Sequence, residues 1–150
     1  MKRLYPLLLV SVLAAVPFSA QAQFAKTEDA VKYRQSSFSL MATHFGRIGA
    51  VVKGEKPYDK AAVEADATLV EMLAKLPWSA FPAGSEAANS KAKAEIWKEQ
   101  DKFHAGSEKL QEEVGKLSVA AKSGDLAAVK KAFGATGQSC KSCHDSYRNK

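Results

Sequence analysis

The amino-acid sequence predicts an all-α protein, and more narrowly an antiparallel four-helix bundle. Apolar side chains recur at intervals of three, four and seven residues through most of the chain after residue 26, which is the spacing of one helix face. Turn residues divide this pattern into four segments, with one longer connection in the middle. No segment shows the strict alternation of a half-buried β-strand. We therefore expect four amphipathic helices around one core.

The first 22 residues are expected to be absent from the mature protein. Two basic residues precede an apolar run that extends to Val16, and small residues follow at positions 20 and 22. This layout is typical of a secretory signal peptide, here cleaved before Gln23. A membrane anchor is the alternative, but the run is short and Pro17 ends it, whereas a spanning helix needs about 20 apolar residues.

The expected mature chain, residues 23–150, is long enough for one domain with a single core. It has no other apolar stretch that could span a bilayer. Without Lys2 and Arg3, 20 basic and 16 acidic residues remain, so the excess is +4 instead of +6. Because the basic residues are scattered among acidic ones, nucleic acid is not expected as a partner.

The first helix is expected over residues 27–52. Thr27 can cap its N-terminus, and Gly54 follows its end. Its apolar face consists of Val31, Phe38, Met41, Phe45, Ile48 and Val52. Gly46 and Gly49 lie inside the helix, where each costs about 1 kcal/mol relative to alanine. Close approach of another segment would explain them, but the sequence does not show it.

The second helix is expected over residues 58–76 and ends at Pro77, which cannot continue it. Residues 77–90 then form the long connection, since two prolines and a glycine interrupt it. Trp78 and Phe81 within this connection predict that it packs against the bundle.

The third helix is expected over residues 91–122, with apolar residues at strict intervals of seven: Ile96, Phe103, Leu110 and Leu117. A turn at residues 123–125 separates it from the fourth helix, which runs from Asp125 to about Arg148. The four segments and their links match the arrangement of a four-helix bundle.

The chemistry of the chain is concentrated in the last helix, at Cys140-Lys141-Ser142-Cys143-His144. Positions i, i+3 and i+4 lie on one helix face, so both sulfurs and the imidazole point in the same direction. This arrangement suits covalent attachment of a haem through two thioethers, with the histidine as an axial iron ligand. We therefore expect a bundle that encloses one covalently bound haem c.

Three other interpretations of the motif are less consistent with the sequence. A zinc site needs about four ligands, and only His44 and His104 are available as further nitrogen donors. A thioredoxin-like redox pair needs a strand before the helix, and none is expected. A disulfide between Cys140 and Cys143 would be geometrically awkward within a helix.

Further segments carry a resemblance to a known family. Besides Cys140 to Asp145, they are Gln23-Phe24-Ala25-Lys26, Val31-Lys32-Tyr33-Arg34-Gln35, Leu40-Met41-Ala42, His44-Phe45-Gly46-Arg47, Leu76-Pro77-Trp78, Phe133-Gly134, Gly137 and Tyr147-Arg148. Together they resemble the class II c-type cytochromes, and within that class the cytochrome c′ family. The resemblance extends over essentially the whole expected mature chain.

The resemblance implies a homodimeric four-helix bundle in the bacterial periplasm, with His144 as the proximal iron ligand and no protein ligand on the distal side. It implies binding of nitric oxide and carbon monoxide, with roles in nitric oxide tolerance and in electron transfer to or from an unidentified redox partner. We expect the dimer to form through the first two helices, whose exposed faces offer small residues such as Ala42, Ala50 and Ala65.

Arg34 occupies the apolar face of the first helix, where a cation needs an anionic partner or a route to water. The resemblance implies that Arg34 and Gln35 contact the haem propionates. The alternative is that Arg34 extends its charged end into water. Phe38, one turn further on, is expected to wall the distal side if Arg34 reaches the edge of the haem. This residue departs from the resemblance, because several family members have an aliphatic residue, often leucine, at the position of Phe38.

Met41 is the alternative sixth ligand, because a thioether and an imidazole together give a low-spin electron carrier; methionine is more often core filler. Arg148 lies one turn beyond His144, and the resemblance implies a position beside the proximal imidazole. The alternative is a C-terminal surface cation that the helix dipole favours. The connection between Phe81 and Ile96 is longer than in related chains, so the haem-contacting loop residue is placed only within 86–91.

A peroxidase would need a distal base, which neither Phe38 nor Met41 supplies, so no enzymatic activity is expected.

Overall fold

The computed structural model describes residues 23–86 and 89–150, so the expected signal peptide, Met1 to Ala22, lies outside it. Its four long helices are α1 (Thr27–Val52), α2 (Lys60–Leu73), α4 (Gln100–Ser123) and α5 (Leu126–Tyr147). Two short elements, the 3₁₀ helix η1 (Pro77–Ala80) and the single turn α3 (Glu95–Lys98), lie between α2 and α4. The all-α expectation is confirmed, because the described ranges contain no strand beyond one isolated bridge between Ala92 and Arg148.

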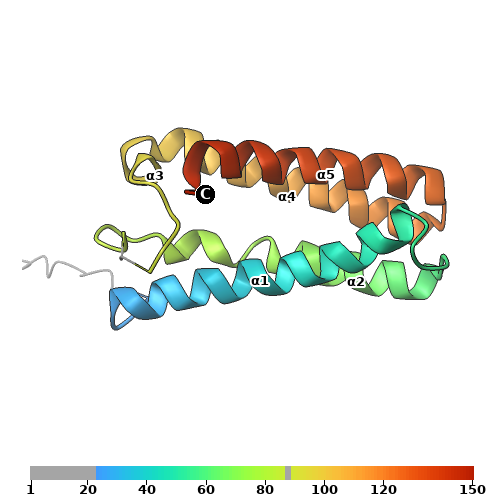
Figure 1. Cartoon of the computed structure of the whole chain (residues 1–150), viewed down its shortest axis with the longest axis horizontal. Helices are drawn as coiled ribbons and strands as arrows, with labels where there is room; N and C mark the ends of the chain where they lie inside the picture. The colour runs from blue at the N-terminus through green and yellow to red at the C-terminus, as the bar shows by residue number, and fades with distance from the viewer. Residues whose placement is uncertain (1–22, 87–88) are drawn as a thin grey trace, which may run out of the picture.

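The long helices form an antiparallel bundle (Figure 1). α1 lies beside α2 and α5, and α4 lies beside the same two helices on the opposite side. Each helix therefore runs antiparallel to both of its neighbours. α3, the connection before it and the C-terminus gather at one end of the bundle. No helix in the described part of the chain combines the length and the apolar character needed to cross a membrane.

Side-chain caps fix the beginnings of two helices. The Asp59 carboxylate accepts a hydrogen bond from the Ala62 amide at the start of α2. At the start of α5 the Asp125 carboxylate accepts from the Ala127 and Ala128 amides, at 2.8 and 3.2 Å. The expected cap at Thr27 was wrong: α1 begins at Thr27, and its N-cap residue is Lys26, which makes no side-chain cap hydrogen bond.

The third expected helix, residues 91–122, was also wrong at its beginning. The Lys93 amide donates to the Tyr147 carbonyl, and the Asn149 amide donates to the Lys91 carbonyl. These bonds hold residues 91–93 in an extended conformation beside the end of α5. The helical pattern therefore starts only at α3 and breaks again at Glu99, where φ is −123° and ψ is 46°. A tertiary contact has overridden the local pattern.

The core is divided along the bundle axis. At the end away from α3, Ile48, Val63, Leu117 and Val129 are buried together with small residues. A second cluster in the middle contains Met41, Val70, Leu110 and Val114. A third, at the α3 end, contains Ile96, Phe103 and Tyr147.

Gly49 permits close packing between α1 and α5, whereas no other segment approaches Gly46 closely. A Cβ atom at Gly49 would lie 3.0 Å from the ring of Phe133, but one at Gly46 would meet nothing within 4 Å. The Phe133 ring is stacked on Phe45 with 4.2 Å between centroids, so it cannot easily retreat. The close approach that the sequence left open is therefore present at one of the two glycines.

This difference gives a prediction about stability. Gly46→Ala should raise the free energy of unfolding by about 0.5–1 kcal/mol, because it improves helix propensity without a clash. Gly49→Ala should instead lower it, ending about 1–3 kcal/mol below Gly46→Ala, because overpacking outweighs the same gain. Denaturant unfolding of both variants measures the difference, and equal stabilities would show that the Phe133 ring yields freely.

Candidate cofactor site

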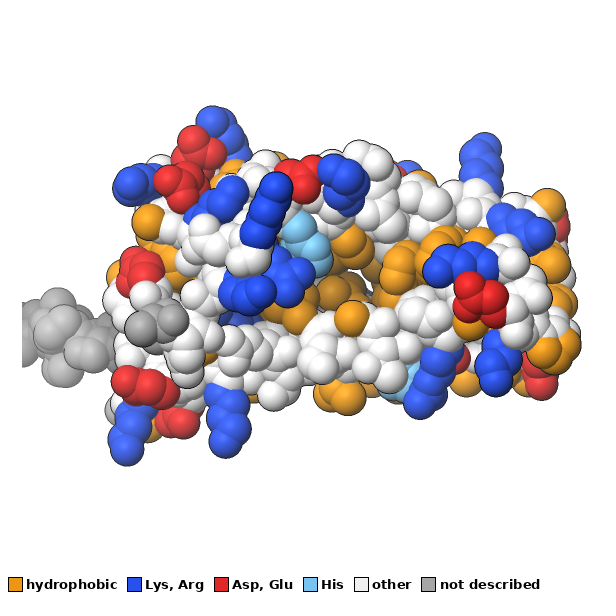
Figure 2. Space-filling view, viewed as in Figure 1, with side chains coloured by type: hydrophobic (Ala, Val, Ile, Leu, Met, Phe, Trp, Pro, Cys, Tyr) orange, Lys and Arg blue, Asp and Glu red, His pale blue; other side chains and the backbone are white. Residues whose placement is uncertain are grey.

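A cavity of about 610 Å³ lies within the α3 half of the bundle. Its lining comes from α1, α2, α4, α5 and the segment that includes η1. Its volume is within the range of roughly 300–1,000 Å³ that is typical of ligand and cofactor sites. Figure 2 shows apolar side chains inside a hollow on this face, with a histidine and several cations around it. The bundle is thus packed at one end and hollow toward the other.

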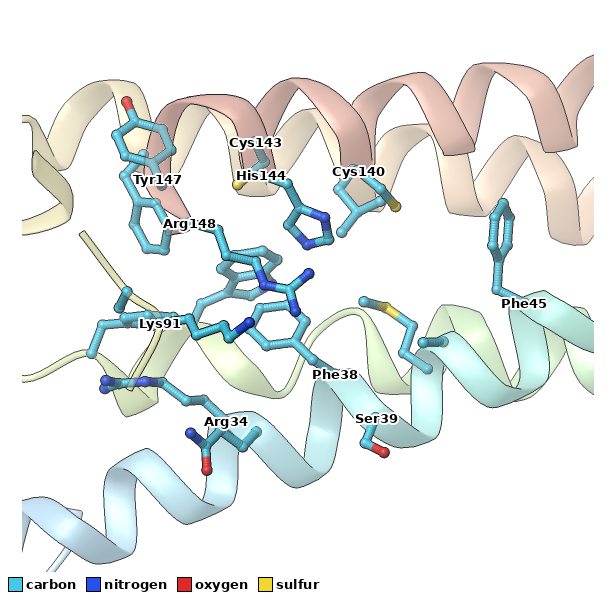
Figure 3. A pocket seen from close by; sticks show the side chains of 18 of the residues that line it. Arg34, Phe38, Ser39, Phe45, Lys91, Cys140, Cys143, His144, Tyr147 and Arg148 are labelled. Atoms are coloured by element: carbon cyan, nitrogen blue, oxygen red, sulfur yellow. The ribbon is translucent and has the colours of Figure 1, made fainter. Parts of the chain in front are cut away.

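Cys140, Cys143 and His144 all line this cavity from α5. The helix is regular through the motif, so the i, i+3, i+4 spacing brings the three groups together as predicted. Figure 3 shows the imidazole of His144 pointing into the cavity. Both cysteines are free thiols, and burial raises the pKa of each. They are therefore neutral at pH 7.

The environment of His144 favours the neutral imidazole. Partial burial and the nearby Arg148 guanidinium lower the pKa of His144 below its usual value, while Asp145 opposes this effect. A neutral imidazole keeps a nitrogen lone pair available for a metal.

The wall opposite His144 is apolar. Figure 3 shows Phe38 rising from α1 toward the histidine. Its ring contacts Trp78 and Phe81 edge-on, with centroid separations of 5.7 and 6.5 Å. Met41 is buried and packs with Val70, Leu110 and Val114, although it also lines the cavity. Phe38 and Met41 themselves offer no acid, base or strong hydrogen-bond donor.

Two cations lie at the mouth of the cavity. Figure 3 shows the Lys91 amine and the Arg148 guanidinium both extending into it. Neither is within ion-pair distance of a carboxylate belonging to the described residues. Gln35 also lines the mouth, and its amide donates to the Asn89 carbonyl at 3.1 Å. The mouth is therefore positively charged.

Arg34 lines the cavity, but its guanidinium points away from His144 (Figure 3). One terminal nitrogen donates to the Ala80 carbonyl and the Ser85 hydroxyl, each at 2.8 Å. The other donates to the Ser85 carbonyl at 2.6 Å and to the Ser90 hydroxyl at 3.0 Å. Burial lowers the pKa of Arg34, and the charge of Glu86 partly offsets this. The side chain is 2% exposed, so the alternative in which its charged end reaches water was wrong.

The other interpretations of the cysteine motif find no support in the structure. His44 is bound to Asp66, with 2.7 Å between Nδ1 and Oδ1, and neither His44 nor His104 lines the cavity. Across residues 23–86 and 89–150, no three His, Cys, Asp or Glu residues are grouped to hold a metal ion. The cysteines lie inside a helix that no strand precedes within those ranges, unlike a thioredoxin-like pair.

Comparison with known proteins shows the family of the chain. Residues 29–148 match the family model described as Cytochrome C′. The chain belongs to the cytochrome c′ family. A cytochrome c′ from Alcaligenes xylosoxydans xylosoxydans is 50% identical over 128 residues, which cover 85% of this chain and 99% of the relative.

Solved structures show the same fold. Cytochrome c prime from Shewanella frigidimarina superposes with a TM-score of 0.83 at 42% identity, covering 85% of this chain and 99% of that one. A nitric oxide complex of a leucine-to-alanine variant of cytochrome c prime from Alcaligenes xylosoxidans superposes with a TM-score of 0.81 at 49% identity, with the same coverage. The expected four-helix bundle is therefore confirmed at the level of the fold.

Haem c, bound covalently, is the cofactor of this family, and the residues of the cavity fit it. Two thiols and an imidazole share one wall, which matches thioether attachment together with axial ligation. The remaining lining is largely apolar, and the cations at the mouth complement the carboxylate groups that a haem carries.

Two features of the site do not follow from the sequence. For the haem-contacting loop residue, the sequence indicated only the range 86–91, of which Lys91 is the last position. The place of Lys91 at the mouth depends on the backbone pairing with the end of α5. The partners of Arg34 lie in residues 80–90, whose conformation follows no periodic pattern. The expectation that Trp78 and Phe81 pack against the bundle was confirmed, since both line the cavity.

Proposed function

We propose that this protein carries one haem c, attached through Cys140 and Cys143 and ligated by His144, and that it binds nitric oxide and carbon monoxide on the opposite side. When bound, the haem would supply an iron that binds a diatomic gas. The observation that carries the proposal is the asymmetry of the cavity: an imidazole projects from one wall, and the aromatic ring of Phe38 faces it. A similar protein, the Alcaligenes xylosoxidans variant, has been solved as a nitric oxide complex.

Phe38 acts as a steric guard in this proposal. Its ring packs against Trp78 and Phe81, so a ligand that needs this space must displace a packed aromatic side chain. Phe38 offers no polar group that would stabilise one bound ligand over another. Discrimination between gases therefore depends on how strongly each one binds the iron relative to the cost of moving the ring.

The charged residues are proposed to orient the cofactor. Arg34 and Gln35 stay on the side of the haem carboxylates, as the family resemblance implies, and Lys91 adds a positive charge at the mouth. Arg148 is placed beside the imidazole of His144, whose pKa it lowers. We propose no enzymatic turnover, because Phe38 and Met41 provide no general acid or base.

The competing proposal is a low-spin electron carrier with Met41 as the sixth ligand. It is supported by the position of Met41 in the cavity lining. Against it, the Met41 side chain is packed with Val70, Leu110 and Val114 in the middle cluster. A role in nitric oxide tolerance or in electron transfer with a redox partner is compatible with the first proposal.

We further propose that the chain is exported to the periplasm and forms a homodimer through α1 and α2. The apolar side chains exposed on this side are larger than the sequence indicated. Leu40 is 52% exposed and Met72 is 61% exposed, and Ala42 and Ala65 are exposed as well. Burial of such residues favours association.

The intact mass of the purified protein tests cofactor attachment and export together. The mass should equal residues 23–150 plus one haem, and the haem should stay with the polypeptide in acid–acetone. A Cys140→Ala, Cys143→Ala variant should have the mass of the bare chain, because no sulfur remains to form a thioether. Extraction of the haem from wild type would exclude covalent attachment, and a mass that includes residues 1–22 would exclude cleavage.

Carbon monoxide binding tests whether Phe38 hinders the access of a gas. If displacement of Phe38 costs about 3 kcal/mol, Phe38→Ala should bind carbon monoxide roughly a hundredfold more tightly. The same substitution should lower stability by about 3 kcal/mol. Stopped-flow association rates and equilibrium titrations of the ferrous protein measure the effect.

Met41→Leu is the matched control for that experiment. If Met41 is only core, this substitution should leave both the carbon monoxide affinity and the broad high-spin ferrous spectrum of wild type unchanged, because its volume is conserved. A sharp low-spin spectrum in wild type that becomes high-spin in Met41→Leu would instead support the electron carrier.

Sedimentation tests the dimer. Wild type should sediment as a dimer at micromolar concentration, and Leu40→Lys should shift it toward monomer by placing a charge in the apolar interface. Val119→Lys is the control, because Val119 is 69% exposed on α4 and lies outside the proposed interface. Monomeric wild type at this concentration would refute the proposal.

A further inference from the structure

The segment from Ala80 to Ser90 depends on Arg34 for its position. It begins at the last residue of η1, and its described residues after Ala80 have neither helical nor strand structure, so their polar backbone groups need partners elsewhere. Arg34 supplies four hydrogen bonds, which reach the beginning, the middle and the end of the segment. Ser85 is fully buried at the centre of this arrangement, and its hydroxyl also donates to the Pro82 carbonyl at 2.7 Å.

The same guanidinium lies against an aromatic ring that lines the cavity. Its central carbon is 4.5 Å from the centroid of the Phe81 ring, within the range of a cation–π contact. Phe81 in turn contacts Phe38, at 6.5 Å, and Phe103, at 4.9 Å. A continuous series of contacts therefore runs from Arg34 through Phe81 to Phe38.

We propose that Arg34 is a positioning residue that controls how easily Phe38 moves out of the path of a gas. Phe38 can yield only if the rings beside it yield, because side chains in a packed interior move together. Phe81 is held on one face by the guanidinium, and the guanidinium is held by four hydrogen bonds to the segment that carries Phe81. Arg34 thus determines how strongly Phe38 resists displacement by an entering gas, without itself touching that gas. This inference rests on the proposed function, in which Phe38 guards the distal side.

The chemistry of arginine suits this role. Its planar fork donates from two nitrogens in fixed directions, and its face can stack on an aromatic ring at the same time. A lysine would have a single donating nitrogen and could not reach all four acceptors. Arg34→Lys should therefore act almost like the loss of the side chain, although it keeps the charge.

The test compares carbon monoxide association rates of the haem-loaded ferrous protein. Arg34→Met should bind about tenfold faster than wild type, which corresponds to a barrier lower by about 1.4 kcal/mol. Ser85→Ala should change the rate in the same direction by a smaller factor. Ser85 does not line the cavity. An effect of Ser85→Ala on the rate therefore comes from the segment and not from a lost contact with the cofactor. Arg47→Met is the matched control, since Arg47 is an exposed arginine on the same helix.

A double variant identifies the route of the effect. If Arg34 acts through Phe38, then Arg34→Met added to Phe38→Ala should accelerate binding no further, because the guard is already gone. Rates that multiply in the double variant, or an Arg34→Met rate equal to that of wild type, would overturn the inference. If Phe38→Ala itself has no effect, the proposed function fails first, so the two failures are distinguishable.

A second measurement does not depend on gas binding. Trypsin should cleave after Lys91, at the end of the anchored segment, faster in haem-loaded Arg34→Met and Ser85→Ala than in wild type and Arg47→Met. Cleavage reports local opening of the backbone. Equal cleavage in all four proteins would show that Arg34 does not hold the segment, and the inference would fail at its first step.

Discussion

The regular backbone of α5 is the constraint on which the rest of the site depends. Because one turn of a helix takes 3.6 residues, Cys140, Cys143 and His144 can share a face only while the hydrogen bonds of α5 remain intact. Asp125 fixes the beginning of the helix, and the pairing of residues 91–93 with residues 147–149 secures its end. The other walls of the cavity are arranged around this face, and each contributes a different property.

Those properties are distributed by element. α5 contributes the groups that can form bonds to the cofactor, α1 contributes Phe38, and the segment after α2 contributes the aromatic side chains that support it. Space for the cofactor exists because the helices leave a cavity in the α3 half of the bundle, whereas α1 and α5 pack closely at the far end, where Gly49 admits the ring of Phe133. A bundle with equally close contact along its whole length would have no room for a group of this size.

Much of this arrangement could be predicted from the sequence, and the rest depended on contacts distant in the chain. The bounds of α1 and the shared face of Cys140 and His144 follow from local periodicity. The extended conformation of residues 91–93 does not, because it is held by backbone bonds to Tyr147 and Asn149. The environment of Arg34 was missed for a similar reason. Its partners lie 46 to 56 residues away in a segment without periodic structure.

The place of the motif in the last described helix has a consequence for how the protein is made. The segments α1, η1 and α4 precede α5 in the chain. They are therefore synthesised before Cys140. The contact between Gly49 and Phe133 joins residues far apart in sequence, and such contacts form late because a long loop must close first. Enclosure of the two thiols therefore depends on segments that are distant in the chain, and a chain in which these segments have not assembled leaves Cys140 and Cys143 exposed.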